Sequence, residues 1–456
     1  MNEQDCLKLI SKYEIENGFF DISINQIKAY IFFRRDIRVA YLKKHGIDSM
    51  HLKYKRNYKA LIKSTLTSLS SLLKLLLSSK RINNVYAAYP RVDKVNGIYL
   101  DKFTDPVINL IEEPGNYVIF DHGMAGVHPM PRLHRESIIY VDFIYVLSEL
   151  VSVVFWPFFY IINKHSVDTL YEKIKDLLND GFSKKIICKK TLQHLFLISF
   201  FKFLFNKLQV KNVFGPARDY QMVYFFAAHS IGIKTFEFQH GITYGESILY
   251  SGYRDLALVP DYFLAFGENN PDTVYGIDPS KIINIGYAFN NYLRNISSDL
   301  TISKNDVLVI SDPEVTDSML SATLKLSEYY PQCNFYVRPH PHEIISDVWT
   351  QKLSKVRNIF IQDKRINIMV ALQSFDNVIG ENSTVLYEAL SLNRKVGKLY
   401  FDGLNPLFLK EEDKDSFWHI RTPENLNCLL QGNSEEKPHK SIYSEFNLEL
   451  LRQIIK

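Results

Sequence analysis

The chain has 456 residues, of which 46% are hydrophobic and 23% are charged, and its formal net charge is +4 at pH 7. This length predicts two or three domains, and the hydrophobic share excludes wholesale disorder. So small a net charge gives no expectation of nucleic-acid binding, although it is compatible with an anionic ligand or membrane surface. The four cysteines form no Cys-x-x-Cys pair, so we expect a cytoplasmic protein with reduced thiols and without a zinc or disulfide framework.

The first part of the chain is expected to be rich in helices. Residues 59–79 carry apolar side chains at helical spacing, and the N-terminus lacks a signal-peptide pattern. The most apolar stretch, residues 137–162, contains two acidic residues, so we expect a buried or surface-associated helix and not a membrane span. Aromatic and basic residues alternate in segments 32–44 and 51–59. These segments are either solvated helix faces or a peripheral contact with the inner face of the cytoplasmic membrane.

Farther along, short apolar runs alternate with helical patterns. Residues 117–120 form a strand candidate, and "VKNVFGPA", "DYQMVYFFAAHSIGI" and "KTFEFQHG" predict a strand, a helix and a strand. A second alternating series follows the polar segment 295–306, the best linker candidate. The pattern predicts an α/β fold with two Rossmann-like domains that face each other across a ligand cleft. We expect an N-terminal domain at 1–298, a C-terminal domain at 299–425, and a helical tail at 426–456 that packs back on the N-terminal domain.

Two strand-end turns in the N-terminal half carry histidine. Asp121 and His122 precede a glycine, and either side chain could act as a general base, although an Asx turn with a surface histidine is the alternative. Gln239, His240 and Gly241 end a later strand, where the glycine would permit a sharp turn into the cleft. The imidazole could be a base or bind a sugar hydroxyl or phosphate, but a lone buried histidine is more often a satisfied structural group.

The "RPHP" turn in the C-terminal half carries groups suited to phosphate. Two prolines stiffen it, Arg338 supplies a fixed positive charge, and His340 can bind a phosphate oxygen. The alternative is a rigid loop with exposed histidines.

The segment "GENSTVLYEAL" predicts a second anion site. Gly380 would let the backbone approach a ligand closely, and Asn382, Ser383 and Thr384 lie where the next helix begins. Hydroxyls and free N–H groups at a helix N-terminus bind anions, and Glu388, one turn later, could accept both ribose hydroxyls of a nucleotide. The alternative is an ordinary helix N-cap.

The "QHG" strand end, "PDYFLAFG", "RPHP" and "ENSTVLYEAL", in this order, resemble the GT-B glycosyltransferases of bacterial surface polysaccharide synthesis (capsule, O-antigen and lipooligosaccharide). The resemblance covers residues 210–401. More narrowly, an acidic-x-Gly motif at Asp121, a His-Pro motif at His340 and a Ser-Thr pair at Ser383 resemble the capsule-synthesis group that includes Kdo, sialic acid and polysialic acid transferases. His122 stands where that group commonly has a second acidic residue, which leaves the identity of the base open.

This resemblance implies an acceptor-side N-terminal domain and a C-terminal domain that binds a nucleotide-sugar donor. It implies metal-independent, inverting transfer of a sialic-acid-like or Kdo-like sugar from a CMP donor to a bacterial surface glycan or glycolipid. The implied positions are Arg338, His340, Ser383 and Thr384 for the donor phosphate, Gly380, Asn382 and Glu388 for the ribose and nucleotide, Gln239 and Gly241 for the acceptor or sugar, and Asp121, His122 or His240 for the base. No cofactor or metal is expected, because cationic side chains and a helix N-terminus would neutralise the phosphate.

Other interpretations stay open at this point. The donor could be a UDP- or dTDP-sugar, or the enzyme could be a teichoic-acid-type glycerophosphotransferase. A sugar epimerase would have the same fold class, and a polysaccharide-assembly scaffold could keep the fold without turnover. Competition among nucleotides and analysis of the product would separate these interpretations.

Overall fold

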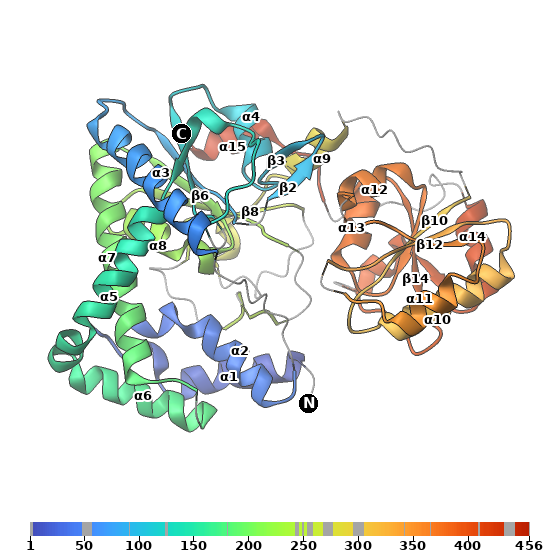
Figure 1. Cartoon of the computed structure of the whole chain (residues 1–456), viewed down its shortest axis with the longest axis horizontal. Coiled ribbons are helices and arrows are strands. Elements are labelled where there is room, and N and C mark those ends of the chain that lie inside the picture. The colour runs from blue at the N-terminus through green and yellow to red at the C-terminus, as the bar shows by residue number, and fades with distance from the viewer. Residues whose placement is uncertain are drawn as a thin grey trace.

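The computed structural model describes residues 3–47, 57–90, 92–123, 126–179, 181–241, 246–248, 250–252, 259–267, 277–294, 305–341, 343–364, 366–408, 411–432 and 443–455. These residues form two α/β domains, each built on a parallel sheet with helices on both faces (Figure 1). The predicted α/β class and the helix-rich N-terminal part are therefore confirmed.

The sheet of the N-terminal domain has seven parallel strands in the order β5-β4-β1-β6-β7-β8-β9. The strands are β1 (Asn84–Ala87), β4 (Tyr117–Asp121), β5 (Ile138–Tyr140), β6 (Asn212–Pro216), β7 (Lys234–Phe238), β8 (Tyr262–Ala265) and β9 (Ile282–Asn284), and β2 (Asp93–Val95) and β3 (Ile98–Leu100) form a separate antiparallel pair. Because the seven strands are parallel, their carboxyl ends lie along one edge, and the segments that follow the strands meet there.

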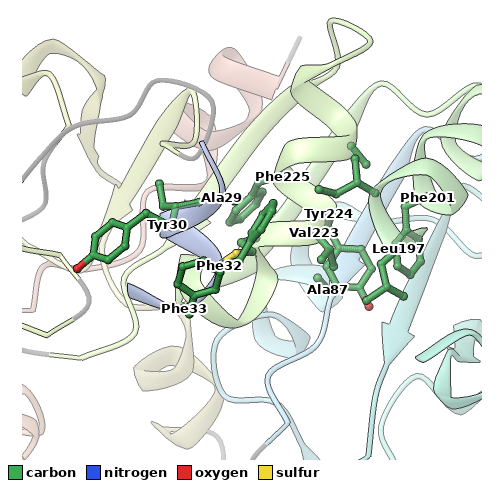
Figure 2. Packing of buried hydrophobic residues seen from close by; sticks show 14 of the residues in the cluster. Ala29, Tyr30, Phe32, Phe33, Ala87, Leu197, Phe201, Val223, Tyr224 and Phe225 are labelled. Atoms are coloured by element: carbon green, nitrogen blue, oxygen red, sulfur yellow. The ribbon is translucent and has the colours of Figure 1, made fainter. Parts of the chain in front are cut away.

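Helices cover both faces of this sheet because successive strand residues point to opposite sides. Val85 and Ala87 pack in one apolar cluster with the helices of the first face, whereas Tyr86 packs in a second cluster on the other face. Figure 2 shows part of the first cluster, in which the rings of Phe201 and Tyr224 lie 4.4 Å apart. The helices of this domain are α1 (Glu3–Glu16), α2 (Arg34–Lys44), α3 (Tyr58–Leu77), α4 (Asp105–Ile111), α5 (Asp142–Ile162), α6 (Lys164–Leu178), α7 (Lys184–Leu208), α8 (Arg218–His229), α9 (Ala288–Arg294) and α15 (Leu448–Ile455).

The N-terminal helices are held by a buried ion cluster. Both carboxylate oxygens of Glu14 accept hydrogen bonds from Arg38, at 2.9 and 2.8 Å, and from Arg34, at 3.2 and 3.0 Å. Arg34 also donates to the carbonyl of Ser251, so α1 and α2 lie beside the loop that follows β7. Within the basic segment 32–44, Arg34 and Arg38 therefore face Glu14 and Phe32, Phe33, Ile37 and Leu42 are buried, whereas Lys43 and Lys44 are exposed at its end.

The C-terminal domain has a six-stranded parallel sheet in the order β12-β11-β10-β13-β14-β15. Its strands are β10 (Val307–Ile310), β11 (Phe335–Arg338), β12 (Ile359–Ile361), β13 (Asn377–Gly380), β14 (Lys395–Leu399) and β15 (Trp418–Ile420), and its helices are α10 (Thr316–Tyr329), α11 (Asp347–Leu353), α12 (Ile368–Ser374), α13 (Thr384–Ser391) and α14 (Leu426–Gln431). The "RPHP" and "GENST" turns follow β11 and β13, which lie on either side of β10, so both turns are at the carboxyl edge.

The boundary predicted at residue 426 is displaced. Leu426 and Leu429 of α14 are buried against the C-terminal sheet, because this helix completes the layer over β14 and β15. The chain has returned to the N-terminal domain by residue 444, where Ser444 N donates to Phe266 O at 2.7 Å, and α15 then packs on α4 (Figure 1). Most of the predicted linker 295–306 and of the basic segment 51–59 lies outside the described residues.

Two helices, α3 and α5, are long and apolar enough to cross a membrane by length and composition. In both helices only 22% of the most apolar window is buried in the protein. α5 packs on α3 and on α7, and α3 packs on β5, so both helices are side-on components of the N-terminal domain.

Candidate functional site

His240 follows β7 at the carboxyl edge of the N-terminal sheet, in a wall of aromatic rings. Its Nε2 lies 2.7 Å from the hydroxyl oxygen of Tyr89, and its ring centroid lies 4.7 Å from that of Tyr89 and 5.5 Å from that of Phe103. Tyr89 comes shortly after β1 and Phe103 after β3. The imidazole is half-buried and held in one orientation, which suits either a base or a substrate anchor.

Gln239, and not Gly241, sets the direction of this histidine. The buried Gln239 side chain accepts a hydrogen bond from Phe266 N at 2.7 Å and donates one to Gly241 O at 3.1 Å, which ties the turn to β8. No described atom lies within 4 Å of a Cβ built on Gly241, and its φ is not positive. Within the described residues, neither a close contact nor a positive φ requires a glycine at this turn.

Asp101 fixes the backbone that carries the aromatic residues Tyr89 and Phe103. Its carboxylate accepts hydrogen bonds from Tyr89 N at 2.8 Å, Phe103 N at 2.9 Å and the Thr104 hydroxyl at 2.8 Å. Asp101 is fully buried, and burial raises the pKa of its carboxyl. No strand-end pattern singled out this residue, because it follows a short two-stranded ribbon.

Lys102 joins the two domains at the same place. Its Nζ lies 3.5 Å from Oε1 of Glu388, which is one turn into α13 of the C-terminal domain. Burial disfavours the Lys102 ammonium, but the Glu388 carboxylate outweighs that effect and raises the pKa of Lys102. Glu388 therefore faces the N-terminal domain, and a lysine without a sequence signature is its partner there.

The "RPHP" turn is held from within by Glu343. Its carboxylate accepts hydrogen bonds from His340 N at 2.8 Å and from the hydroxyls of Ser311 at 2.6 Å and Thr316 at 2.9 Å. The turn therefore presents the half-buried His340 on a fixed backbone after β11.

Arg338, by contrast, binds the protein itself. Its guanidinium donates to the carbonyls of Asp363 at 2.6 Å, Lys364 at 3.2 Å and Ile366 at 2.5 Å. These contacts fix the loop between β12 and α12, and the guanidinium has few donors left for a phosphate. We therefore leave Arg338 out of the anion site.

The start of α13 combines a cap with strand packing. Ser383 is the N-cap, and its hydroxyl accepts a hydrogen bond from Val385 N at 3.3 Å, while Asn382 accepts one from Leu407 N at 2.6 Å. A Cβ on Gly380 would lie 3.0 Å from the Ile310 carbonyl oxygen, so the small residue is required by the neighbouring strand β10. Close approach of a ligand is not needed to explain this glycine, whereas the helix N-terminus at Thr384 keeps the geometry of an anion site.

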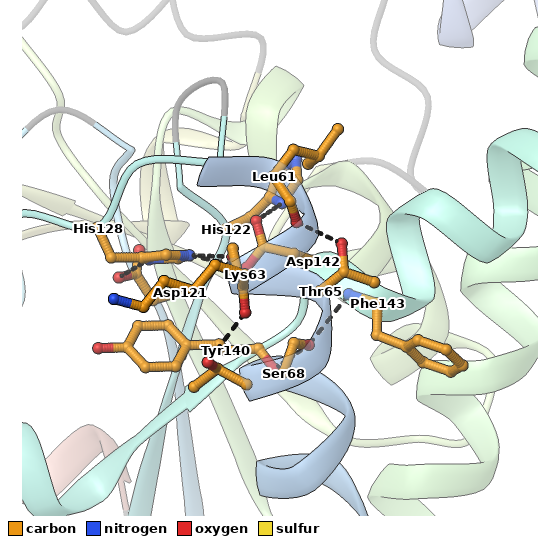
Figure 3. Close-up of polar contacts among 12 residues, drawn as sticks. Leu61, Lys63, Thr65, Ser68, Asp121, His122, His128, Tyr140, Asp142 and Phe143 are labelled. Carbon is orange, nitrogen blue, oxygen red and sulfur yellow. Dashed lines mark hydrogen bonds and ion pairs between the residues drawn. The ribbon is translucent and has the colours of Figure 1, made fainter. Parts of the chain in front are cut away.

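A second polar cluster lies at the ends of β4 and β5 (Figure 3). His128 is held between two carboxylates: its Nδ1 lies 3.0 Å from Oδ2 of Asp121, and its Nε2 lies 2.8 Å from Oδ2 of Asp142. His122 stacks on Tyr145 with ring centroids 4.1 Å apart, and its Nδ1 lies 3.4 Å from Oδ1 of Asp142. Because two carboxylates face the two ring nitrogens, His128 is an imidazolium cation in this arrangement and not a free base.

The Ser64 hydroxyl also lies 2.9 Å from Nε2 of His128, an arrangement that resembles a Ser-His-Asp triad. The proton on Nε2 is directed to Asp142, so His128 cannot take the proton of the hydroxyl. The cluster therefore provides no serine nucleophile.

The His128 ion cluster gives a pH-dependent stability. Burial alone would lower the pKa of His128, but the two carboxylates outweigh burial and raise the pKa from 6.5 to about 9. The stabilisation is therefore fully present below the unfolded-state pKa, near 6.5, and is lost as the pH rises through 9. It amounts to about 3 kcal/mol.

Between pH 6.5 and pH 10, we expect the unfolding free energy of the wild type to fall by about 3 kcal/mol more than that of His128→Gln. Urea unfolding of both proteins at several pH values measures the difference. Equal slopes for the two proteins would show that His128 is not held as a cation.

The structure separates the three candidate bases. Asp121 ends β4 and His122 follows it, whereas His240 follows β7, and three strand spacings of about 4.8 Å lie between these strands. Lys102, which contacts Glu388, and Phe103, which contacts His240, thus connect these two candidates at the domain junction, whereas the Asp121 cluster lies three strands away along the sheet edge.

Asp142, the residue that joins the two histidines of this cluster, was noted in the sequence only as a charge in an apolar stretch. Its position two residues after the β5 strand, at the start of α5, is the signal that could have identified it. Among the described residues, no group of three or more His, Cys, Asp or Glu side chains is arranged to hold a metal ion.

No protein-family model matches the chain, and no curated protein matches it. Solved structures do. The UDP-GlcNAc 2-epimerase from Methanocaldococcus jannaschii is 12% identical, with a TM-score of 0.50 over 82% of this chain and 99% of that one. The UDP-GlcNAc 2-epimerase from Neisseria meningitidis, bound to UDP-GlcNAc, is 12% identical over 82% and 98% of the two chains, with a TM-score of 0.48. MurG from Acinetobacter baumannii is 11% identical over 82% and 98%, with a TM-score of 0.39.

The chain has the GT-B fold. The predicted arrangement of two Rossmann-like domains is confirmed by this likeness and by the two parallel sheets. At 12% identity the likeness shows the fold and leaves the reaction to be argued from the site.

Proposed function

We propose that the chain is a glycosyltransferase that binds a nucleotide-sugar donor between its two domains and transfers the sugar to a hydroxyl of a bacterial surface glycan or glycolipid. The observation that carries this proposal is the contact between Lys102 and Glu388, 3.5 Å apart across the domain junction. It brings the carboxylate of α13, suited to ribose hydroxyls, next to Phe103, whose ring lies 5.5 Å from that of His240. The candidate donor-binding residue Glu388 and the candidate base His240 therefore both lie at the domain junction, on either side of Lys102 and Phe103. A cytoplasmic location is part of the proposal.

We propose a UDP-sugar as the donor. Support comes from the shared fold, since the similar structure from M. jannaschii is a UDP-GlcNAc 2-epimerase. A CMP-activated sialic-acid-like or Kdo-like sugar, suggested by the three-motif resemblance, is the competing donor, and dTDP is a third. The nucleotide that binds decides among them.

In this proposal the C-terminal domain holds the donor. Glu388 accepts hydrogen bonds from the ribose hydroxyls, which requires Lys102 to leave its present partner. The freed ammonium can then stabilise the negative charge that develops on the leaving nucleotide. The N-terminus of α13 at Ser383 and Thr384, together with His340, would bind the phosphates, so that cationic groups and a helix dipole could act without a metal.

In this proposal His240 contacts the reacting hydroxyl. Inverting transfer needs a base that removes the proton of the acceptor as the sugar is transferred. Asp121 is buried against His128, and His122 follows β4, three strands away, whereas the ring of His240 contacts Phe103, the residue next to Lys102. We therefore assign the base to His240 and an acceptor-binding position to His122.

Epimerisation of a UDP-sugar is the second candidate function, because the M. jannaschii epimerase shares the fold. Incubation with UDP-GlcNAc alone, followed by separation of the nucleotide sugars, distinguishes the two reactions. A new UDP-sugar without acceptor indicates epimerisation, whereas turnover only in the presence of a glycan acceptor indicates transfer.

Donor binding is tested by thermal unfolding with CMP, CDP, UDP, dTDP and GDP in EDTA, since a ligand that binds the folded state raises its melting temperature. We expect UDP to stabilise the wild type. Glu388→Gln should bind UDP about 10- to 100-fold more weakly, because it loses the charge-assisted hydrogen bonds to the ribose. Glu328→Gln, an exposed carboxylate on α10, is the control and should bind as the wild type does.

Stabilisation by CMP alone would replace the UDP donor with the CMP donor and keep the site. Wild-type affinity in Glu388→Gln would remove Glu388 from the donor site. No response to any nucleotide would favour a non-catalytic scaffold.

A further inference from the structure

Helices α3 and α5 expose large apolar side chains on an unusual scale. Leu77 is 86% exposed and Ile162 is 81% exposed. We name as the α3–α5 face the exposed apolar residues Tyr58, Ile62, Leu66, Leu73 and Leu77 of α3 and Leu150, Val153, Val154, Phe155, Phe158, Ile161 and Ile162 of α5.

Both helices bury several of their serines beside a few apolar side chains, such as Leu72 of α3 and Phe159 of α5. Ser64 and Ser68 of α3 are buried, and the Ser68 hydroxyl donates to Tyr140 O at 2.6 Å and accepts from Phe143 N at 3.0 Å. Ser148 and Ser152 of α5 are buried as well, each with its hydroxyl bonded to a carbonyl of its own helix. A surface helix in water has its apolar stripe toward the core and polar residues outside, whereas α3 and α5 carry a second apolar stripe on the outside. The outward apolar stripes therefore indicate an apolar partner.

The exposed residues recur at helical spacing, so each helix carries one stripe. The two helices pack on each other, and Figure 1 shows α3 and α5 along the same flank of the N-terminal domain. The serine contacts of α3 and the buried Asp142 of α5 fix both helices side-on to the domain. Such helices can lie in the plane of a surface but are not placed to cross it.

The charges beside this face are mostly positive, and the acidic residues near it are the half-buried Glu149 of α5 and Glu136. α3 contains no acidic residue, and its exposed lysines Lys59, Lys63 and Lys74 flank the apolar stripe. Lys74 also lines a surface groove of about 800 Å³ whose charged side chains are Lys74, Lys80, Arg135 and one acidic residue, Glu136. At the far end of α5, the exposed Lys164 begins the next helix. Two copies of the chain joined through this face would bring like charges together, whereas an anionic surface would complement them.

We infer that the α3–α5 face docks on an anionic lipid surface, with its apolar side chains at the boundary of headgroups and acyl chains and its lysines against the phosphates. Helices with an apolar stripe and a lysine flank bind in this way, and the affinity grows with the apolar area buried and with anionic lipid content. The inference does not depend on the proposed reaction, since it concerns a surface outside the domain junction.

Sedimentation with lipid vesicles tests this inference on the full-length protein. We expect binding to vesicles of phosphatidylcholine with 30 mol% phosphatidylglycerol, weaker binding to phosphatidylcholine alone, and weakening by salt. The double variant Phe155→Ser/Phe158→Ser should bind at least about tenfold more weakly. Both rings are more than half exposed, at 51% and 65%, so its unfolding midpoint should change little. Ile344→Ser, which removes an 89% exposed side chain in the C-terminal domain, is the matched control.

Two further measurements make the outcome decisive. In the first, the variant Lys59→Glu/Lys63→Glu should lose the preference for anionic vesicles. In the second, brominated lipids should quench the fluorescence of the half-buried Trp156 of α5, and the quenched part of the emission should be absent in Trp156→Phe. Unchanged binding in the phenylalanine double variant, or no quenching of Trp156, would overturn the inference. A dimer in size-exclusion chromatography would also overturn it if Phe155→Ser/Phe158→Ser, and no other variant, converted that dimer to a monomer. The partner of the face would then be a second copy of the chain.

Discussion

Asp121→Ala is expected to lower the free energy of unfolding by about 3–5 kcal/mol, as removal of one partner of a buried ion pair does. Asp121 is only 4% exposed, and its Oδ2 lies 3.0 Å from Nδ1 of His128 and 4.0 Å from Nη1 of Arg132. Without the carboxylate these two groups remain buried with less negative charge to compensate them. Urea unfolding at pH 7 measures the loss.

The variant Asp176→Ala is the control, because Asp176 is an exposed carboxylate on α6, and its change should stay within about 0.5 kcal/mol. The double variant Asp121→Ala/His128→Ala should lose less than the sum of the single variants, since it also removes the uncompensated cation. A different pattern would restore Asp121 as the catalytic base: wild-type stability in Asp121→Ala with turnover largely abolished.

The sequence was sufficient to predict which polar side chains lie at the strand ends, because that follows from local patterns. Apolar runs that end in polar turns marked the strand ends at Asp121, His240, His340 and Ser383, and parallel strands must bring those ends to one edge of their sheet. The same reasoning placed Glu388 on the inner side of α13, and its contact with Lys102 agrees with that position.

What could not be predicted was which neighbour each group would meet. Lys102 and Asp101 follow a short ribbon with no strand-helix signature, yet one reaches Glu388 across 286 positions of sequence and the other holds Tyr89 and Phe103 in place. Such partners depend on tertiary packing. A distinctive residue can likewise serve a local need: the guanidinium of Arg338 binds three backbone carbonyls.

The sequence also could not predict which face of a helix packs against the protein. Residues 59–79 showed helical spacing, which fixes the existence of α3 and the width of its apolar stripe. Spacing does not say which stripe faces the protein. The hydrogen bonds of Ser68 to Tyr140 and Phe143 fix this, with Leu72 and Leu75 buried and Leu66, Leu73 and Leu77 exposed.

His240→Ala is expected to lower kcat by about 10²- to 10⁴-fold, the range for loss of a general base, while the affinity for the donor nucleotide stays within about twofold of the wild type. The imidazole contacts Tyr89 and Phe103 of the N-terminal domain, whereas the proposed donor contacts come from the C-terminal domain. Removing the ring therefore affects the transfer step more than donor binding. Initial rates with the donor identified by thermal unfolding, together with its binding curve, measure both quantities.

Two variants show whether the loss is chemical. Tyr89→Phe removes the hydroxyl 2.7 Å from Nε2 and should reduce kcat by about tenfold, the effect of one lost hydrogen bond on the orientation of the base. His165→Ala, an exposed histidine on α6, should leave kcat unchanged. A base at His240 also predicts that the fall of kcat at acid pH, present in the wild type, disappears in His240→Ala. A wild-type kcat in His240→Ala together with a large loss of kcat in His122→Ala would contradict this assignment. The base would then be His122, at the end of β4, with Asp142 orienting its ring.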